Sequence, residues 1–358
     1  MTRFKALPQV SRRLESQLLR TARNCTMALA LPLLTGMAAT STTALAQTNN
    51  AAAPAIRPEV VKLLQASQDA LREGQLDKAL TVAQQAMAMP NISKDERPYV
   101  LRTLAAAAMQ AKNFVLAIST LETLVQELPD TTLPDQRTAL IESILSAAQQ
   151  AQDLERFVKW ARIYLDQGGR NPSVRPVLIQ TLSVLKQHEA VIKEVKVKIK
   201  SDEEYSVNTP EIELRLMAYS QRMLKDDAGY NASLKMLLQR YPSKAYWAEV
   251  IPRVARQANF NIRFDLDLYR LLELTGNMED PTEYTDMANL ALKNGLPAEA
   301  ARVVELAFSS GIFGKGSDVA NQQKLRQQVQ QKLNEDEKAL PALEKSAKDA
   351  NAIASLAE

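Results

Sequence analysis

The residues of this chain that could perform acid–base, nucleophilic or metal chemistry are few. The chain has one histidine, His188, in the stretch Lys186-Gln187-His188-Glu189. A single histidine cannot build a multi-histidine metal site, and no G-x-S-x-G motif is present to place a serine nucleophile beside it. We therefore interpret His188 as a solvated polar residue at a turn between two helices.

Adjacent carboxylates and one glycine-rich stretch are the other features that could carry chemistry. The carboxylate pairs are Glu203-Glu204, Asp226-Asp227, Glu279-Asp280 and Glu335-Asp336. Each pair lies at an expected loop or helix end, where solvated charge is a simpler explanation than a glycosidase acid pair. Gly314-Lys315-Gly316 lacks the spacing of a G-x-x-x-x-G-K-[ST] phosphate loop. The sequence therefore predicts a protein that is not an enzyme and binds no cofactor or metal.

The first 46 residues have the three parts of a secretory signal peptide. Six Lys and Arg residues form a basic start, residues 27–39 are apolar, and Ala44-Leu45-Ala46 fits an A-x-A cleavage site. We predict cleavage after Ala46 and a periplasmic location. An uncleaved anchor is the alternative, although the apolar run is short against the ~20 residues that a membrane span needs.

One residue of the leader, Glu15, helps to distinguish the twin-arginine route of export from the general secretory route. Ser11-Arg12-Arg13 resembles a twin-arginine signal, but Glu15 stands where that signal has an apolar residue. No cofactor signature requires folding before export, so we favour the general secretory route.

Removing the leader changes the charge of the chain. The full chain has 44 Lys and Arg and 41 Asp and Glu; removing residues 1–46 leaves 38 and 40, a net charge of −2. This balance does not favour nucleic acid or an anionic membrane as a partner. The one cysteine, Cys25, lies in the leader, so the mature chain needs no disulfide. We find no later segment that could span a membrane.

The elements that position any site are helices that recur in pairs. Residues 60–90 and 98–130 each show apolar and small residues at three- and four-residue spacing, a short turn, a second helix of the same period and a proline. Small residues fall where two helices must approach closely: Ser67 with Ala79, and Ala105 with Ala117. Residues 281–313 repeat the pattern, and about seven hairpins fit the whole chain. In a third, less regular hairpin, Phe157 takes the place of the small residue.

These hairpins resemble the tetratricopeptide repeat (TPR), a helix-turn-helix of about 34 residues. The resemblance is carried by the small and apolar positions, whereas Leu63 and Leu101 stand where the family usually has Trp. It implies an all-α, right-handed α-solenoid of stacked hairpins. We predict a signal peptide over 1–46, a disordered spacer over 47–57, the solenoid over 58–316, and polar C-terminal helices over 317–358. Those helices, about 318–338 and 341–356, would cap the array or bind a partner.

The resemblance also implies where a partner binds, because in TPR proteins the first helix of each hairpin lines a concave groove. The family's groove positions fall on mixed polar and apolar residues, which suit an extended peptide or a partner helix; the alternative is that many of them simply face water. The candidate groove residues are Leu64, Gln68, Arg72, Tyr99, Arg102, Met109, Gln110, Asn289 and Lys293. Only Asn289 and Lys293 could contribute to a carboxylate clamp, so we do not expect one.

Residues 240–247, Arg-Tyr-Pro-Ser-Lys-Ala-Tyr-Trp, form the densest aromatic cluster. Val250, Ile251 and Val254 follow Trp247 at helical spacing, which favours packing over a binding role. This stretch and the closing hairpin are similar to TPR proteins associated with TonB-type systems.

We therefore predict a periplasmic scaffold or adaptor for other envelope proteins. A peptidoglycan- or glycan-binding helical module is the alternative, and it would require exposed aromatic residues along the groove, where only Tyr99 qualifies. A helical accessory domain of a wall-cleaving enzyme is disfavoured by the absence of a catalytic constellation.

Overall fold

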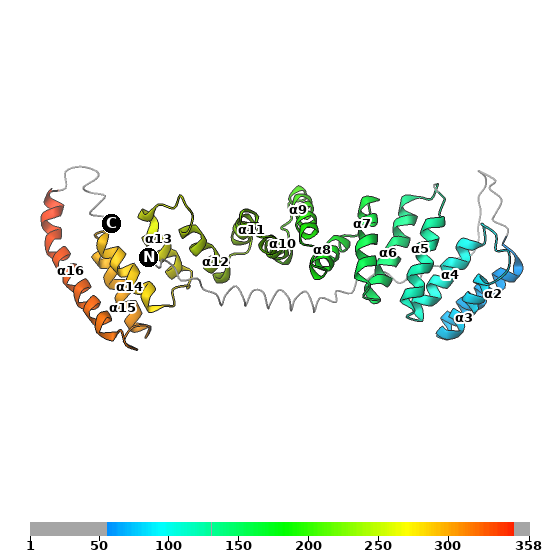
Figure 1. Cartoon of the computed structure of the whole chain (residues 1–358), viewed down its shortest axis with the longest axis horizontal. Helices are drawn as coiled ribbons and strands as arrows, with labels where there is room; N and C mark the ends of the chain where they lie inside the picture. The colour runs from blue at the N-terminus through cyan, green and yellow to red at the C-terminus, as the bar shows by residue number, and fades with distance from the viewer. Residues whose placement is uncertain (1–55, 130, 347–358) are drawn as a thin grey trace, which may run out of the picture. The chain divides into compact units, whose positions relative to one another are not determined.

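The computed structural model describes residues 56–129 and 131–346, and this part of the chain is all-α (Figure 1). The helical periodicity of the sequence explains this class, and the prediction of an all-α fold is confirmed. The helices are α2 (Pro58–Arg72), α3 (Leu76–Met87), α4 (Arg97–Gln110), α5 (Phe114–Glu127), α6 (Pro134–Gln150), α7 (Leu154–Asp166), α8 (Val174–Val184), α9 (His188–Glu204), α10 (Glu211–Met223), α11 (Asp227–Arg240), α12 (Lys244–Ala255), the 3-10 helix η1 (Ile262–Phe264), α13 (Asp265–Leu274), α14 (Pro281–Lys293), α15 (Pro297–Ser309) and α16 (Val319–Ser346).

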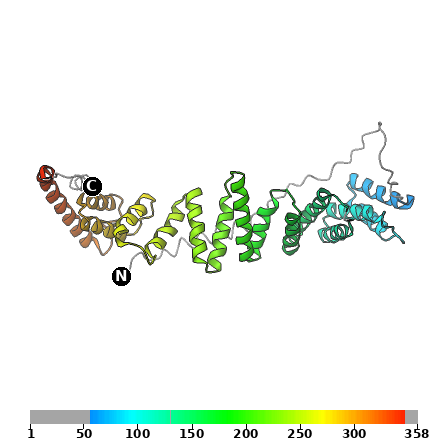
Figure 2. The same cartoon turned by 90° about the horizontal axis from the view of Figure 1, so that it is seen from above.

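The chain forms two compact units with a boundary between Asp226 and Asp227. In the described residues the N-terminal unit contains α2 to α10 and the C-terminal unit contains α11 to α16. Within each unit every helix packs against the next helix along the chain, as Figure 2 lets the reader follow. Each unit is therefore a stack of helical hairpins, the arrangement of an α-solenoid.

Six of the turns between consecutive helices share one backbone conformation. A residue with positive φ ends the first helix: Gly74 (73°), Lys112 (57°), Gln152 (55°), Lys186 (57°), Lys225 (58°) and Gly295 (75°). The next residue donates its N–H to a carbonyl five positions earlier, as Asn113 does to Ala108 at 2.8 Å. This is the helix-ending motif that satisfies the last free carbonyls of a helix. The turn residues from Gly74 to Lys225 give the first helices of the N-terminal unit a common register.

Small residues allow the close approach within the first hairpin. Ser67 is fully buried, and its Oγ donates a hydrogen bond of 2.8 Å to the carbonyl of Ala79 on the facing helix. Ala117 is equally buried at the equivalent place in the second hairpin. Phe157, the large residue of the third hairpin, is 2% exposed. The predicted contact positions are confirmed as buried.

Two helix boundaries differ from the sequence prediction. We expected a loop over 201–208, but α9 continues to Glu204, and the Lys198–Asp202 ion pair, one helical turn apart, stabilises this extension. We also expected two C-terminal helices, but α16 runs through Pro341 to Ser346 without a break. A proline removes one main-chain hydrogen bond, and the surrounding sequence has high helix propensity. Residues 347–358 of the expected second helix lie outside the described residues.

The first part of α16 completes the core of the C-terminal unit. Leu325 and Val329 are buried in the same apolar cluster as residues of α13, α14 and α15. The buried Gln322 accepts a hydrogen bond of 2.8 Å from the N–H of Gly314, and Arg326 forms a bidentate pair with Glu305 of α15. This part of α16 therefore packs as a cap on the last hairpin of the unit. Within the described residues, none of the helices is both long and apolar enough to cross a bilayer.

Candidate partner-binding face

The first helices of the first two hairpins, α2 and α4, pack directly against each other. We call their shared candidate surface the α2–α4 face. It consists of Gln68 and Arg72 on α2 and Tyr99, Arg102, Met109 and Gln110 on α4. All six are exposed except Met109, which is half-buried. Six of the nine residues predicted from the sequence thus lie on these two adjacent helices.

The polar groups of this face are available to a ligand. Within the described residues, Gln68, Arg102 and Gln110 make no hydrogen bond or ion pair. Arg72 reaches only Asp69, at 3.1 Å, and both side chains are more than half exposed, so that pair is weak. The side chain of Tyr99 is 41% exposed. The face therefore presents amide and guanidinium donors together with one exposed tyrosine.

The charged residues of α4 are all positive. Its sequence, RPYVLRTLAAAAMQ, contains two arginines and no acidic residue. Arg97 is neutralised by Glu127 of α5 at 2.7 Å, and this hydrogen bond raises the pKa of Arg97. Arg102 has no such partner within the described residues. A carboxylate or a carbonyl-rich backbone is the chemistry that an unpaired guanidinium binds best.

Three predicted residues lie elsewhere. Leu64 is 8% exposed and packs in an apolar cluster with Val60, Ala86 and Val100, so it belongs to the core below the face. Asn289 and Lys293 are exposed on α14 of the C-terminal unit. They lie four residues apart on one helix and have no polar partner within the described residues. They form a separate polar patch.

An ion pair that the sequence analysis did not find fixes the start of α2. The carboxylate of Glu96 is 1% exposed and accepts hydrogen bonds from Arg57 Nε at 2.8 Å, from Arg57 Nη2 at 2.9 Å, and from the backbone N–H groups of Arg57 and Ser93, both at 2.9 Å. The hydrogen bonds from Arg57, followed by that from Ser93, lower the pKa of Glu96 to about 2. This clamp joins the start of α2 to the loop before α4 and thereby sets the two helices of the face.

Arg57 falls in the stretch that we predicted as a disordered spacer, and its pairing with Glu96 draws the last residues of that stretch onto the helical body. Residues 47–55 lie outside the described residues. The sequence shows an acidic residue, Glu96, just before the helix that starts near Pro98. It does not show that Glu96 pairs with Arg57, which lies 39 residues earlier.

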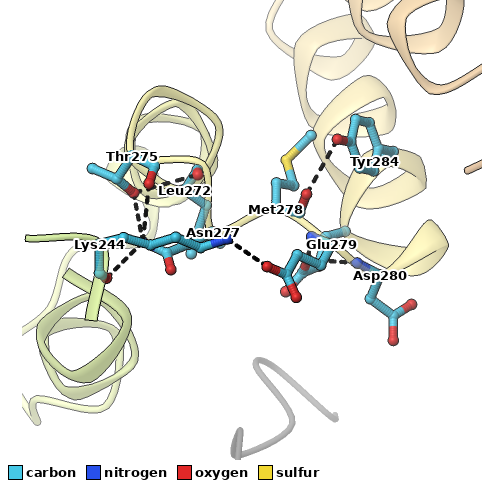
Figure 3. A network of polar contacts seen from close by, with 9 residues as sticks. Lys244, Leu272, Thr275, Asn277, Met278, Glu279, Asp280 and Tyr284 are labelled. Atoms are coloured by element: carbon cyan, nitrogen blue, oxygen red, sulfur yellow. Dashed lines mark hydrogen bonds and ion pairs between the residues drawn. The ribbon is translucent and has the colours of Figure 1, made fainter. Parts of the chain in front are cut away.

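A second polar network holds α14 in the C-terminal unit (Figure 3). Asn277, 6% exposed, donates from Nδ2 to the carbonyl of Lys244 at 3.1 Å and to Thr275 Oγ1 at 2.9 Å. Lys244 Nζ reaches Glu279 Oε1 at 2.5 Å. The hydroxyl of Tyr284 donates to the carbonyl of Met278 at 3.2 Å. The start of α12, the end of α13 and the start of α14 are therefore joined at one point.

The aromatic stretch before α12 has a packing role, as the helical spacing predicted. Ser243 caps α12 by accepting a hydrogen bond of 3.3 Å from the N–H of Tyr246. Tyr246 is 4% exposed, and Trp247 packs against the apolar cluster of the C-terminal unit. These aromatic residues are therefore core residues of α12.

His188 is not the solvated residue that we expected. It is half-buried at the start of α9, its Nδ1 lies 3.3 Å from Ser220 Oγ on α10, and its ring meets Tyr219 edge-on with centroids 5.8 Å apart. Ser220 is fully buried, so its hydroxyl cannot reach a substrate. This pair joins α9 to α10.

The acidic pairs also have structural surroundings. Asp280 and Glu283 form a capping box at the start of α14, and Glu335 pairs with Lys332 inside α16, not at a helix end as predicted. In the described part of the chain, no group of three or more His, Cys, Asp or Glu residues could hold a metal ion.

Comparison with known proteins gives a similarity in fold only. No protein-family model matches the chain, and no curated protein matches it. Among solved structures, the TPR2AB domain of yeast Sti1 in a complex with pHSP90 is similar, with a TM-score of 0.39 and 16% identity over 76% of this chain and 98% of that chain. A TPR protein from Parabacteroides merdae gives 0.33 and 14% over 83% and 96%. Yeast Tom70 gives 0.29 and 12% over 80% and 71%. Because these TM-scores are low, we base the fold class on the chain's own helix packing.

Proposed function

We propose that this chain is a non-enzymatic scaffold that binds a protein or peptide on the α2–α4 face. The observation that carries the proposal is the set of donors on this face, Gln68, Arg102 and Gln110, which have no partner within the described residues. They lie on α2 and α4, and α4 also carries the exposed Tyr99. Tyrosine and arginine are the side chains that most often anchor protein interfaces.

The cellular setting of the proposal comes from the leader. Residues 1–46 would direct export, and the scaffold would then act on other proteins of the cell envelope. The resemblance of residues 240–247 to TPR proteins associated with TonB-type systems motivates the finer proposal that the partner belongs to such a system. Fractionation of cells expressing the chain with and without residues 1–46 tests the location: loss of the periplasmic signal on deletion is expected, and an unchanged distribution contradicts it.

Photocrosslinking tests the binding face in the full chain. A photoreactive amino acid replaces Tyr99 in one variant and Val115 in another; Val115 is a matched control because it is 66% exposed on α5, away from the face. We expect a discrete crosslinked species from position 99 and none from position 115. Adding Arg102→Glu should abolish the species, since it reverses the charge next to the probe. Equal crosslinking at both positions, or no effect of Arg102→Glu, would contradict the proposal.

A glycan- or peptidoglycan-binding module is the second candidate. It is favoured by a single observation, the 41% exposed ring of Tyr99. Sedimentation with purified cell-wall sacculi separates the two candidates. Binding that is lost in Tyr99→Ala but kept in Arg102→Glu would favour the glycan candidate over the scaffold.

A further inference from the structure

The N-terminal unit contains four joints at which the second helix of one hairpin packs on the first helix of the next: α3–α4, α5–α6, α7–α8 and α9–α10. The left-handed turn residues Gly74, Lys112, Gln152, Lys186 and Lys225 align these joints. At each joint we compare two residues. The first lies twelve positions after the turn residue of one hairpin, and the second lies twelve positions before the turn residue of the next hairpin. The pairs are Ala86 with Val100, Leu124 with Leu140, Tyr164 with Val174, and Lys198 with Glu213.

The register is supported by burial. Seven residues of α4 and seven of α10 are buried, and they occupy identical positions relative to Lys112 and Lys225. Ala86 and Val100 lie in one apolar cluster, as expected if the paired positions meet at the α3–α4 joint. At the first three joints the paired residues are apolar or aromatic. At the fourth joint they are Lys198 and Glu213.

Glu213 is the unusual member of this set. Its side chain is 2% exposed, and its Oε2 has no hydrogen-bond partner within the described residues. Lys198, which could neutralise it, donates to both oxygens of Asp202 at 2.8 and 3.0 Å. Burying an ionised carboxylate without a paired charge costs several kcal/mol in general.

The remaining charged groups around Glu213 do not compensate for it. Arg175 of α8 is paired with Glu194 of α9, and both groups are mostly buried. Glu211 and Arg215 lie two positions away on α10 itself, and the buried Nε and Nη2 of Arg215 make no hydrogen bond to Glu213 or to any other group within the described residues. Burial raises the pKa of Glu213 to about 7; Lys198 opposes this rise and Asp202 adds to it.

We propose that the α9–α10 joint is a pH-dependent weak point of the N-terminal unit, closed when the buried carboxyl of Glu213 is protonated and loosened when it is ionised. Opening of the joint exposes Glu213 to water, where its ordinary pKa is about 4.5. The closed form therefore holds the proton more tightly than the open form. The sign follows: the equilibrium constant for opening rises with pH, by up to about tenfold per unit between about 4.5 and about 7, and levels off above that.

Hydrogen exchange of the full chain tests this proposal between pH 5 and pH 8, with rates corrected for the intrinsic pH dependence of exchange. Amides of α9 and α10 should show an opening constant that rises by about 40-fold between pH 5 and pH 7, while amides of α4 and α5 in the same sample should not. Glu213→Gln keeps the shape of the protonated side chain and should remove the rise. Glu213→Val restores the residue type of the other joints and should also remove it.

Two further variants separate a titrating joint from a merely weak one. Val100→Glu places a buried carboxyl at the equivalent position of the α3–α4 joint and should create the same pH dependence there. His188→Gln disturbs the other end of the α9–α10 pair and should leave the pH dependence in place. The proposal is overturned if wild-type α9 and α10 show no pH-dependent opening, or if Glu213→Gln keeps it; this decision stands even if Val100→Glu does not fold.

Discussion

Replacing Lys112 with glycine should stabilise the N-terminal unit. Lys112 has a φ of 57°, and its side chain is exposed and makes no hydrogen bond or ion pair within the described residues. A left-handed conformation costs a residue with a Cβ about 1–2 kcal/mol, and glycine adopts it freely. Glycine also loses about 0.4–1 kcal/mol more conformational entropy on folding. The difference predicts a net stabilisation of roughly 0.5–1 kcal/mol in Lys112→Gly.

The opposite change at Gly74 provides a matched test. Gly74 has a φ of 73°, and a Cβ added there would meet nothing within 4 Å. Gly74→Lys should therefore destabilise through backbone strain alone, by about the amount that Lys112→Gly gains. Lys112→Ala removes the lysine side chain but keeps the Cβ, so it should be close to neutral.

Thermal and urea unfolding of the full chain measure these effects. For a unit of this size, 1 kcal/mol corresponds to a Tm shift of about 2–4 °C. A destabilised Lys112→Gly, or a Gly74→Lys variant as stable as wild type, would show that these turns do not impose the left-handed register. The alignment of hairpins, on which the joint comparison depends, would then lose its basis.

Three further changes probe the packing and the polar contacts. Phe157→Ala should cost about 3–5 kcal/mol in urea unfolding, because the ring is 2% exposed and its removal leaves a cavity at a helix contact; Phe157→Leu should cost clearly less. Asn277→Ala should cost about 1–3 kcal/mol in the C-terminal unit, because the carbonyl of Lys244 and the hydroxyl of Thr275 lose the hydrogen bonds from the buried Asn277 side chain. Glu96→Gln should loosen the start of α2 at neutral pH. In wild type the lowered pKa of Glu96 means that its contribution is complete above about 4.5 and is lost as the pH falls toward about 2, which exchange of the α2 amides would report.

The hairpins themselves could be predicted from the sequence because their physical causes are local. Apolar residues recur at helical spacing, and each turn lies within a few residues of the helix that it ends. The contact between Ser67 and Ala79 was predictable because only small side chains permit two helices to approach so closely. The packing role of Trp247 followed in the same way from the apolar residues behind it on α12.

The candidate face could be predicted only in part, because some of it depends on contacts between distant residues. Leu64 sits at a groove position of the TPR pattern but packs with Val100 of the next hairpin, a neighbour that local spacing does not reveal. The pairing of Arg57 with Glu96 joins residues 39 positions apart. His188 reads as a turn residue in the sequence, yet α10 brings Ser220 to its ring. In each case, the charge of the residue and its spacing along the chain do not identify the residue that it contacts.

The buried face of α10 is polar at several points, and this supports a specific role for the α9–α10 joint. Relative to the shared turn register, α10 places Glu213, Ser220 and Gln221 where α4 has Val100, Ala107 and Ala108. One buried polar residue could be an isolated defect, but with three on one helix we expect the α9–α10 joint to be less stable than the other joints of the N-terminal unit.

The triple variant Glu213→Val, Ser220→Ala, Gln221→Ala tests this reasoning. It gives α10 the buried residue types of α4, and its α10 amides should then exchange as slowly as those of α4 at every pH. The single variant Glu213→Gln should remove the pH dependence but leave α10 the faster-exchanging helix. If the triple variant instead exchanges faster than wild type, the polar residues stabilise the joint, and its weakness must come from somewhere other than the α10 core.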